Sequence, residues 1–230
     1  MPISLIIFDL DGTLADTLTD ITNSLNHALK AKGLEKTLTE GRVKGLIGEG
    51  VGKLIEKAIS QKELENPELA EEIKKKFIAH YKKHLLDNTE AYPWVPEVLK
   101  GLYGFKKAVI SNKMYPLTKK ILEGLGLAPY FDIVAGPETA KEKKPSPAPV
   151  LYVLDKLGLD PSEAVMIGDS KFDFRSGKAA KVKCTVGVSY GYGNGGDLKE
   201  ADYVIGGIDE LVTLLYKNEP MLERRTTRRD

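Results

Sequence analysis

Cysteines, long apolar runs and excess charge are what this sequence has least of. Cys184 is the only cysteine among 230 residues, which excludes an intramolecular disulfide and a zinc site built from several thiolates. The longest apolar run near the start, residues 5–8, is too short for a signal peptide or a membrane span. We therefore expect a soluble, cytoplasmic protein without a membrane partner.

The charges nearly cancel, with 34 lysines and arginines against 33 aspartates and glutamates. This balance gives no overall attraction to nucleic acid, so an anionic partner must be attracted by a local site. A basic tail at residues 224–229 could touch nucleic acid, but we interpret it as a solvated terminus. The composition gives no prediction of the oligomeric state.

The spacing of apolar residues divides the chain into three parts. Residues 3–8 are typical of a strand buried on both faces. From about residue 16 to 86, apolar stripes recur at helical spacing, and Thr17 with Asp20 resembles a capping box. Strands and helices alternate afterwards. Strands are expected at 108–110, 131–135, 164–167, 183–188 and 203–205, and helices at 96–103, 116–125, 147–157 and 208–216.

Repeated strand–helix units predict an α/β fold with a parallel, doubly wound sheet. The helical segment interrupts this sheet after its first strand, so it is an insertion. We predict a core domain from residues 1–15 and 87–230, with a helical domain at 16–86.

Polar residues directly follow three of the expected strands: Asp9 with Asp11, Ser111 with Asn112, and Asp169. In open α/β sheets, ligands bind at the carboxyl ends of the strands, so the fold should bring these side chains to one edge. A cluster of carboxylates repels itself unless a hard cation binds to its oxygens. Mg²⁺ at Asp9, Asp11 and Asp169 is the natural candidate.

Such a site suits attack on a phosphate monoester. One carboxylate would attack the phosphorus, and the second could protonate the leaving oxygen and then activate water. Lys144 could balance the phosphoryl charge, while the Ser111 hydroxyl and the backbone amide of Asn112 could donate hydrogen bonds to phosphoryl oxygens. Each feature alone has an ordinary explanation as a turn, a helix cap or a solvated lysine. Their combination at strand ends indicates phosphoryl chemistry.

These segments resemble the motifs of the haloacid dehalogenase-like hydrolases. Residues 9–14 (DLDGTL) look like the DxDGT signature, and residues 109–112 (VISN) look like the second motif. Residues 144–147 (KPSP) are similar to the lysine loop, and residues 168–173 (GDSKFD) to the fourth motif. The resemblance covers nearly the whole chain and implies a Rossmann-like core with a small α-helical cap. Such a cap closes over the site and excludes water.

The resemblance also implies a role for each motif residue. Asp9 would be the nucleophile and Asp11 the acid/base. The metal would be bound by Asp9, by the backbone carbonyl of Asp11 and by Asp169. Asp173 would support the metal shell through water.

The same resemblance assigns binding of the substrate and its phosphoryl group to three further residues. Lys144 would neutralise its charge and Ser111 would bind it. Thr13, in the first signature, is assigned to substrate binding.

Two further segments, residues 42–50 and 190–193, resemble those of phosphoglycolate phosphatases. Gly48 and Gly50, before a helix, would expose backbone amides to a substrate carboxylate, with which Arg42 could also pair. A helix-to-helix turn and an exposed helical arginine are the competing interpretations. Lys181 departs from the family, whose members commonly have a glycine there, and this could alter the following turn.

The function that the resemblance implies is Mg²⁺-dependent hydrolysis of 2-phosphoglycolate, a small anionic phosphate ester. Alternatives are a phosphatase for another small ester or for pyrophosphate, a phosphomutase, and a non-catalytic binding module. Asp11 argues against a dehalogenase, because it supplies the acid/base that phosphoryl chemistry needs. His80 and His84 have a metal-binding spacing, but no third ligand accompanies them.

Overall fold

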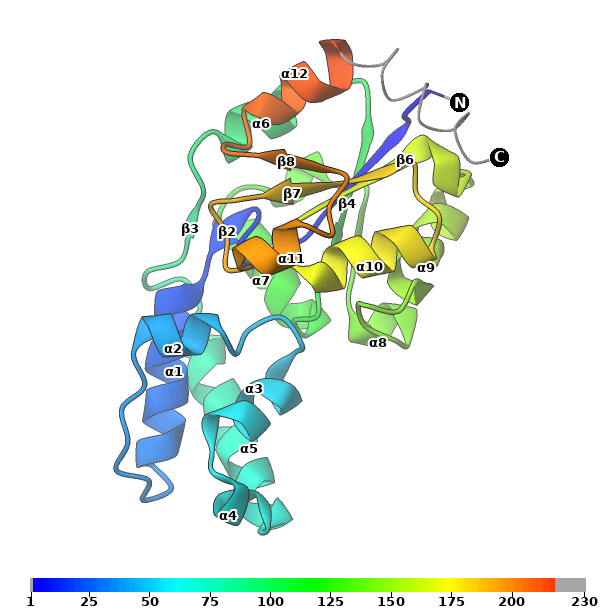
Figure 1. Cartoon of the computed structure of the whole chain (residues 1–230). Helices are drawn as coiled ribbons and strands as arrows, with labels where there is room; N and C mark the ends of the chain where they lie inside the picture. Colours follow the sequence, from blue (N-terminus) through cyan, green and yellow to red (C-terminus); the bar gives the residue numbers. More distant parts are fainter. Residues whose placement is uncertain (1, 218–230) are drawn as a thin grey trace.

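A six-stranded parallel sheet forms the centre of the protein, with strand order β5-β4-β1-β6-β7-β8 (Figure 1). The computed structural model describes residues 2–217, so the basic tail lies outside the described part. The strands are β1 (Leu5–Phe8), β4 (Lys106–Ile110), β5 (Ile133–Ala135), β6 (Ala164–Gly168), β7 (Cys184–Val188) and β8 (Tyr203–Ile205). The helices of this core are α6 (Val95–Gly101), α7 (Tyr115–Gly124), α8 (Pro137–Ala140), α9 (Ala148–Leu157), α10 (Lys171–Ala179), α11 (Gly195–Leu198) and α12 (Glu210–Lys217).

Helices cover both faces of the sheet, as a doubly wound fold requires. Along the central strand β1, Ile6 and Phe8 pack into the apolar cluster that includes α6, α7 and α12. Leu5 and Ile7 point to the opposite face and pack against α9. All four side chains are fully buried. The predicted α/β class and parallel sheet are therefore confirmed.

A block of helices is inserted between β1 and β4 and lies beside the carboxyl edge of the sheet (Figure 1). It contains α1 (Leu18–Lys30), α2 (Glu40–Lys44), α3 (Val51–Ala58), α4 (Gln61–Leu64) and α5 (Pro67–His84). Its main contact is between α1 and α5. The chain enters and leaves the block through β2 (Ala15–Asp16) and β3 (Glu90–Ala91), which pair as an antiparallel ribbon. No helix within residues 2–217 is both long and apolar enough to cross a membrane.

The predicted capping box at the start of α1 is wrong. Thr17 is the N-cap residue, but its side chain makes no capping hydrogen bond. Its hydroxyl instead donates to Asp11 over 2.5 Å. Asp20 accepts hydrogen bonds from the backbone amides of Asn88 and Thr89, at the other end of the block. Thr17 and Asp20 therefore bond to groups outside α1 rather than to each other's backbone amides, as a capping box would require.

Lys181 keeps the turn that a glycine would make. Its φ is +63°, in the left-handed region that glycine adopts without steric cost. The residue directly follows the C-cap of α10, Ala180. Because a residue with a Cβ is strained in this region, the turn after α10 places some strain in Lys181.

The three histidines of the chain stack between α1 and α5. Ring centroids are 4.0 Å apart for His27 and His80, and 4.2 Å apart for His80 and His84. His80 Nδ1 also lies 3.0 Å from the Ser24 hydroxyl, and His84 Nδ1 lies 2.7 Å from Asp87. Burial, followed by the two neighbouring imidazoles, lowers the pKa of His80. The stack therefore favours a neutral His80.

Candidate active site

A cavity of about 370 Å³ opens at the carboxyl edge of the sheet, between the core and the helical block. The core residues that line it include Asp9, Asp11, Ser111, Asn112, Lys113 and Asp169. The helical block contributes Lys44, Gly48, Gly50 and Tyr81 among others. The fold thus brings the three predicted strand-end sites to a single cavity.

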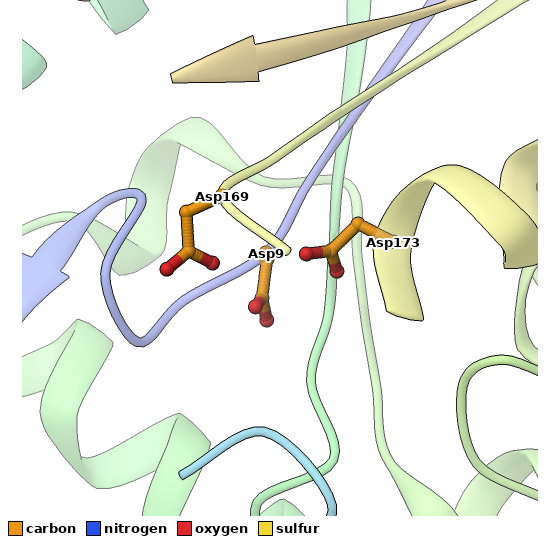
Figure 2. Close-up of side chains that lie close together, drawn as sticks. All are labelled: Asp9, Asp169 and Asp173. Carbon is orange, nitrogen blue, oxygen red and sulfur yellow. The ribbon is translucent and has the colours of Figure 1, made fainter. Parts of the chain in front are cut away.

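Three carboxylates converge at this edge from different elements (Figure 2). Asp9 follows β1, Asp169 follows β6, and Asp173 lies in the first turn of α10. Each offers an oxygen, and these oxygens lie within 4.8 Å of one another. Asp169 Oδ2 accepts hydrogen bonds from the amides of Tyr192 and Gly193, over 2.6 and 3.0 Å. A set of hard oxygen donors at this spacing fits a divalent cation.

Lys144 is the positive group in contact with this cluster. Its side chain is 2% exposed, and its ammonium lies 2.8 Å from Asp9 Oδ1 and 2.6 Å from Asp173 Oδ1. Burial raises the pKa of Asp9; Lys144 opposes this shift, while Asp173 and Asp169 add to it. Burial and the neighbouring Asp173 raise the pKa of Asp169 to about 7. One ammonium among three carboxylates leaves the cluster short of positive charge, which a bound cation would supply.

The side chain of Asp11 is directed away from the three-carboxylate cluster. Its Oδ1 accepts a hydrogen bond from the Thr17 hydroxyl and lies 2.8 Å from the ammonium of Lys113. Gly12 makes the turn that follows, with a φ of +84°. A Cβ at Gly12 would overlap the carboxylate of Asp169, so the position needs glycine for space as well as for conformation.

Asn112 ties the lysine loop to the helical block. Its side-chain amide donates to the carbonyls of Gly48 and Lys144, over 2.7 and 2.8 Å. Its Oδ1 accepts a hydrogen bond from the amide of Lys144 over 2.8 Å. The neighbouring Ser111 hydroxyl accepts a hydrogen bond from the amide of Lys113. The Asn112 side chain therefore acts as a structural link.

Among the predicted substrate-binding residues, Thr13 and Arg42 do not line the cavity. The Thr13 side chain is fully buried, and its hydroxyl has no hydrogen-bond partner among the described residues. Arg42 is exposed because α2 turns its neighbour Val43 into the core instead. Gly50 does line the cavity and is the N-cap residue of α3, so the first turn of α3 begins there.

Sequence reasoning assigned no contact with the site aspartates to Thr17, Lys113, Tyr192 and Gly193, although all four make one. Lys113 directly follows Ser111 and Asn112, and this adjacency to a strand-end motif was a usable signal. The other three make contacts between distant segments, such as the hydrogen bond from the Thr17 amide to the Tyr192 hydroxyl over 2.6 Å.

Asp9, Asp169 and Asp173 with the buried Lys144 form a carboxylate centre of the kind that phosphoryl chemistry needs. Residues 6–187 match the family model of the haloacid dehalogenase-like hydrolases, and the chain belongs to this family.

Relatives of known name align over most of the chain. The phosphoglycolate phosphatase of Aquifex aeolicus is 41% identical over 193 residues, which cover 81% of this chain and 85% of the relative. That of Colwellia psychrerythraea is 37% identical, covering 85% and 88%. A crystal structure described as a predicted phosphoglycolate phosphatase, from Haemophilus somnus, superimposes with a TM-score of 0.86 at 31% identity. The superposition covers 92% of this chain and 97% of that one.

Proposed function

We propose that this protein hydrolyses 2-phosphoglycolate to glycolate and phosphate, with Mg²⁺ as its metal. The observation that carries the proposal is the placement of Asp9 at a cavity wall, against Lys144 and beside two further carboxylates. Two relatives named phosphoglycolate phosphatase, at 41% and 37% identity, support the choice of substrate.

In the first step, a carboxylate oxygen of Asp9 attacks phosphorus and the ester P–O bond breaks. The electron pair of the broken P–O bond leaves with the glycolate oxygen, which takes a proton from Asp11. In the second step, water attacks the phosphorus of the aspartyl-phosphate, gives a proton to Asp11 and displaces Asp9. Two displacements thus replace one difficult one. Asp11 is assigned the proton transfers because it lines the same cavity as Asp9.

The surrounding residues hold the reacting groups. Lys144 and the amide of Leu10, which donates over 2.7 Å, orient the Asp9 carboxylate. Mg²⁺, when bound, would offset the negative charge of the carboxylates and of the phosphate. Asp9, Asp169 and the Asp11 carbonyl would hold it, with Asp173 in support.

The helical block would act as the cap over the leaving group. Its loop at residues 48–50 is attached to the core by two hydrogen bonds. Asn112 donates to the Gly48 carbonyl, and Lys143 donates to the Glu49 carbonyl over 2.7 Å. We assign the amides that follow Gly48 and Gly50 to the anionic substrate, because α3 has no capping side chain at its N-terminus.

The test is release of phosphate from 2-phosphoglycolate, other small phosphate esters and pyrophosphate, with Mg²⁺ or with EDTA. We expect release that requires Mg²⁺ and is fastest with 2-phosphoglycolate. The variant Asp9→Asn should stay folded and lose turnover. Asp155→Asn, which changes an exposed carboxylate on α9, should keep it.

The possible outcomes separate the parts of this proposal. Full activity of Asp9→Asn would contradict the nucleophile assignment. If another ester is hydrolysed fastest, the proposed chemistry of Asp9 stands, but the assignment of 2-phosphoglycolate as the substrate is wrong. Isomerised sugar phosphate without free phosphate would indicate a mutase instead.

A further inference from the structure

Lys113 is a buried cation in the cavity that the proposed reaction leaves without a role. Its side chain is 7% exposed. Its ammonium lies 2.8 Å from Asp11 and donates to the hydroxyl of Tyr81 over 2.7 Å. It also lies 4.7 Å from the centre of the Tyr81 ring. Lys113 belongs to the core and Tyr81 to α5, so this contact joins the two parts of the protein at the cavity.

The ammonium of Lys113 is held between Asp11 of the core and Tyr81 of α5. Among residues 2–217, the hydrogen bond to Tyr81 and the ion pair with Asp11 account for two of its three N–H donors. Within this part of the chain, one donor remains for a further anion in the cavity that Lys113 lines.

The lysines that contact Asp9 and Asp11 lie on different sides of the reaction. Lys144 contacts Asp9, the residue that takes the phosphoryl group. Lys113 contacts Asp11, the residue that protonates the departing oxygen. Lys113 is therefore on the side of the leaving group. In 2-phosphoglycolate, the carboxylate is separated from that oxygen by a single methylene.

We propose that Lys113 is a specificity-determining residue that binds the carboxylate of the leaving group, with Tyr81 holding its ammonium in place. The proposal rests on the proposed function and assigns its substrate preference to one side chain of the core. Arg42, which does not line the cavity, has no part in it. The uncharged leaving group of another ester would make no ion pair with Lys113.

The experiment compares kcat/KM for 2-phosphoglycolate and for ethyl phosphate, which carries a methyl group in place of the carboxylate. Their ratio cancels any loss common to both substrates, including a changed Asp11 or a smaller folded fraction. In Lys113→Met we expect the ratio to fall about 10- to 100-fold, the effect of one hydrogen bond from a charged donor. Lys113→Arg should recover part of it. Lys119→Met, which removes an exposed lysine of α7, should leave the ratio unchanged.

Each result decides between the two claims. If the wild-type protein shows no preference for 2-phosphoglycolate over ethyl phosphate, both the proposed substrate and the proposed role of Lys113 are wrong. A wild-type preference that persists in Lys113→Met would overturn the role of Lys113 alone. If Lys113→Met does not fold, Tyr81→Phe provides the same comparison. It keeps the ring and removes the hydroxyl, so a fall of a few-fold supports the proposal and an unchanged ratio overturns it.

Discussion

Replacing Asn112 by alanine should loosen the lysine loop and the cap loop at the same time. The side chain makes two hydrogen bonds to the backbone of Lys144 and one to the carbonyl of Gly48. Asn112 is 8% exposed and Lys144 is 2% exposed, so the two groups of Lys144 would remain buried without partners. Each such group costs about 1–3 kcal/mol, whereas the half-buried Gly48 carbonyl loses about 1 kcal/mol because water can reach it.

We therefore expect Asn112→Ala to lower the free energy of unfolding by about 3–7 kcal/mol. For a chain of this size, each kcal/mol lowers the melting temperature by about 2–4 °C, so it should fall by at least roughly 6 °C. Phosphate release should also fall, because the loop that positions Lys144 against Asp9 loses its support. Urea unfolding followed by circular dichroism measures the first effect, and the phosphate assay measures the second.

Asn23→Ala provides the matched control, since Asn23 is exposed on α1 and its loss should change stability by less than about 0.5 kcal/mol. If Asn112→Ala lowers the free energy of unfolding by less than about 1 kcal/mol and keeps its activity, the three hydrogen bonds do not hold the lysine loop in place. That result would refute the reasoning.

Two further predictions concern the metal site and the cap. In Gly193→Ala, the new Cβ would overlap the carbonyl of Asp169, so the Mg²⁺ concentration for half-maximal activity should rise at least about tenfold. Gly195→Ala, whose Cβ meets open space, should leave that concentration unchanged; equal values for both would contradict the argument. The free energy of unfolding should decrease as the pH falls below about 6.5, because the unfolded chain protonates His80 before the folded one does. Urea titrations from pH 8 to 5 should show a shallower decrease in His80→Gln, and identical slopes would exclude this role of the stack.

The parts of the site that follow directly from local pattern were predictable from the sequence. Asp9, Ser111 and Asp169 each come after a short apolar run, and buried parallel strands place such residues at one edge. The strand order itself brings them together, because β1 lies between β4 and β6.

What could not be predicted depends on contacts between distant segments or on very short elements. In a capping box, the Thr17 hydroxyl would accept a hydrogen bond from the first turn of α1. In the folded chain it donates to Asp11 instead, which the local sequence does not show. Lys113 and Tyr81 are 32 residues apart and on different parts of the protein. Helices α4, α8 and α11 have four residues each, too few to establish a helical period.

The ribbon of β2 and β3 also has a consequence for how such proteins diversify. Asp16 and Glu90 are paired directly across it, so the two ends of the helical block lie only about 5 Å apart. Another folded segment whose two ends are equally close could replace the helical block at this point without changing a strand of the core. The carboxylates and Lys144 all belong to the core, outside the exchanged unit. Contacts that the helical block makes to a substrate could therefore change with the exchanged unit, while the carboxylates, Lys144 and Lys113 stay in the core.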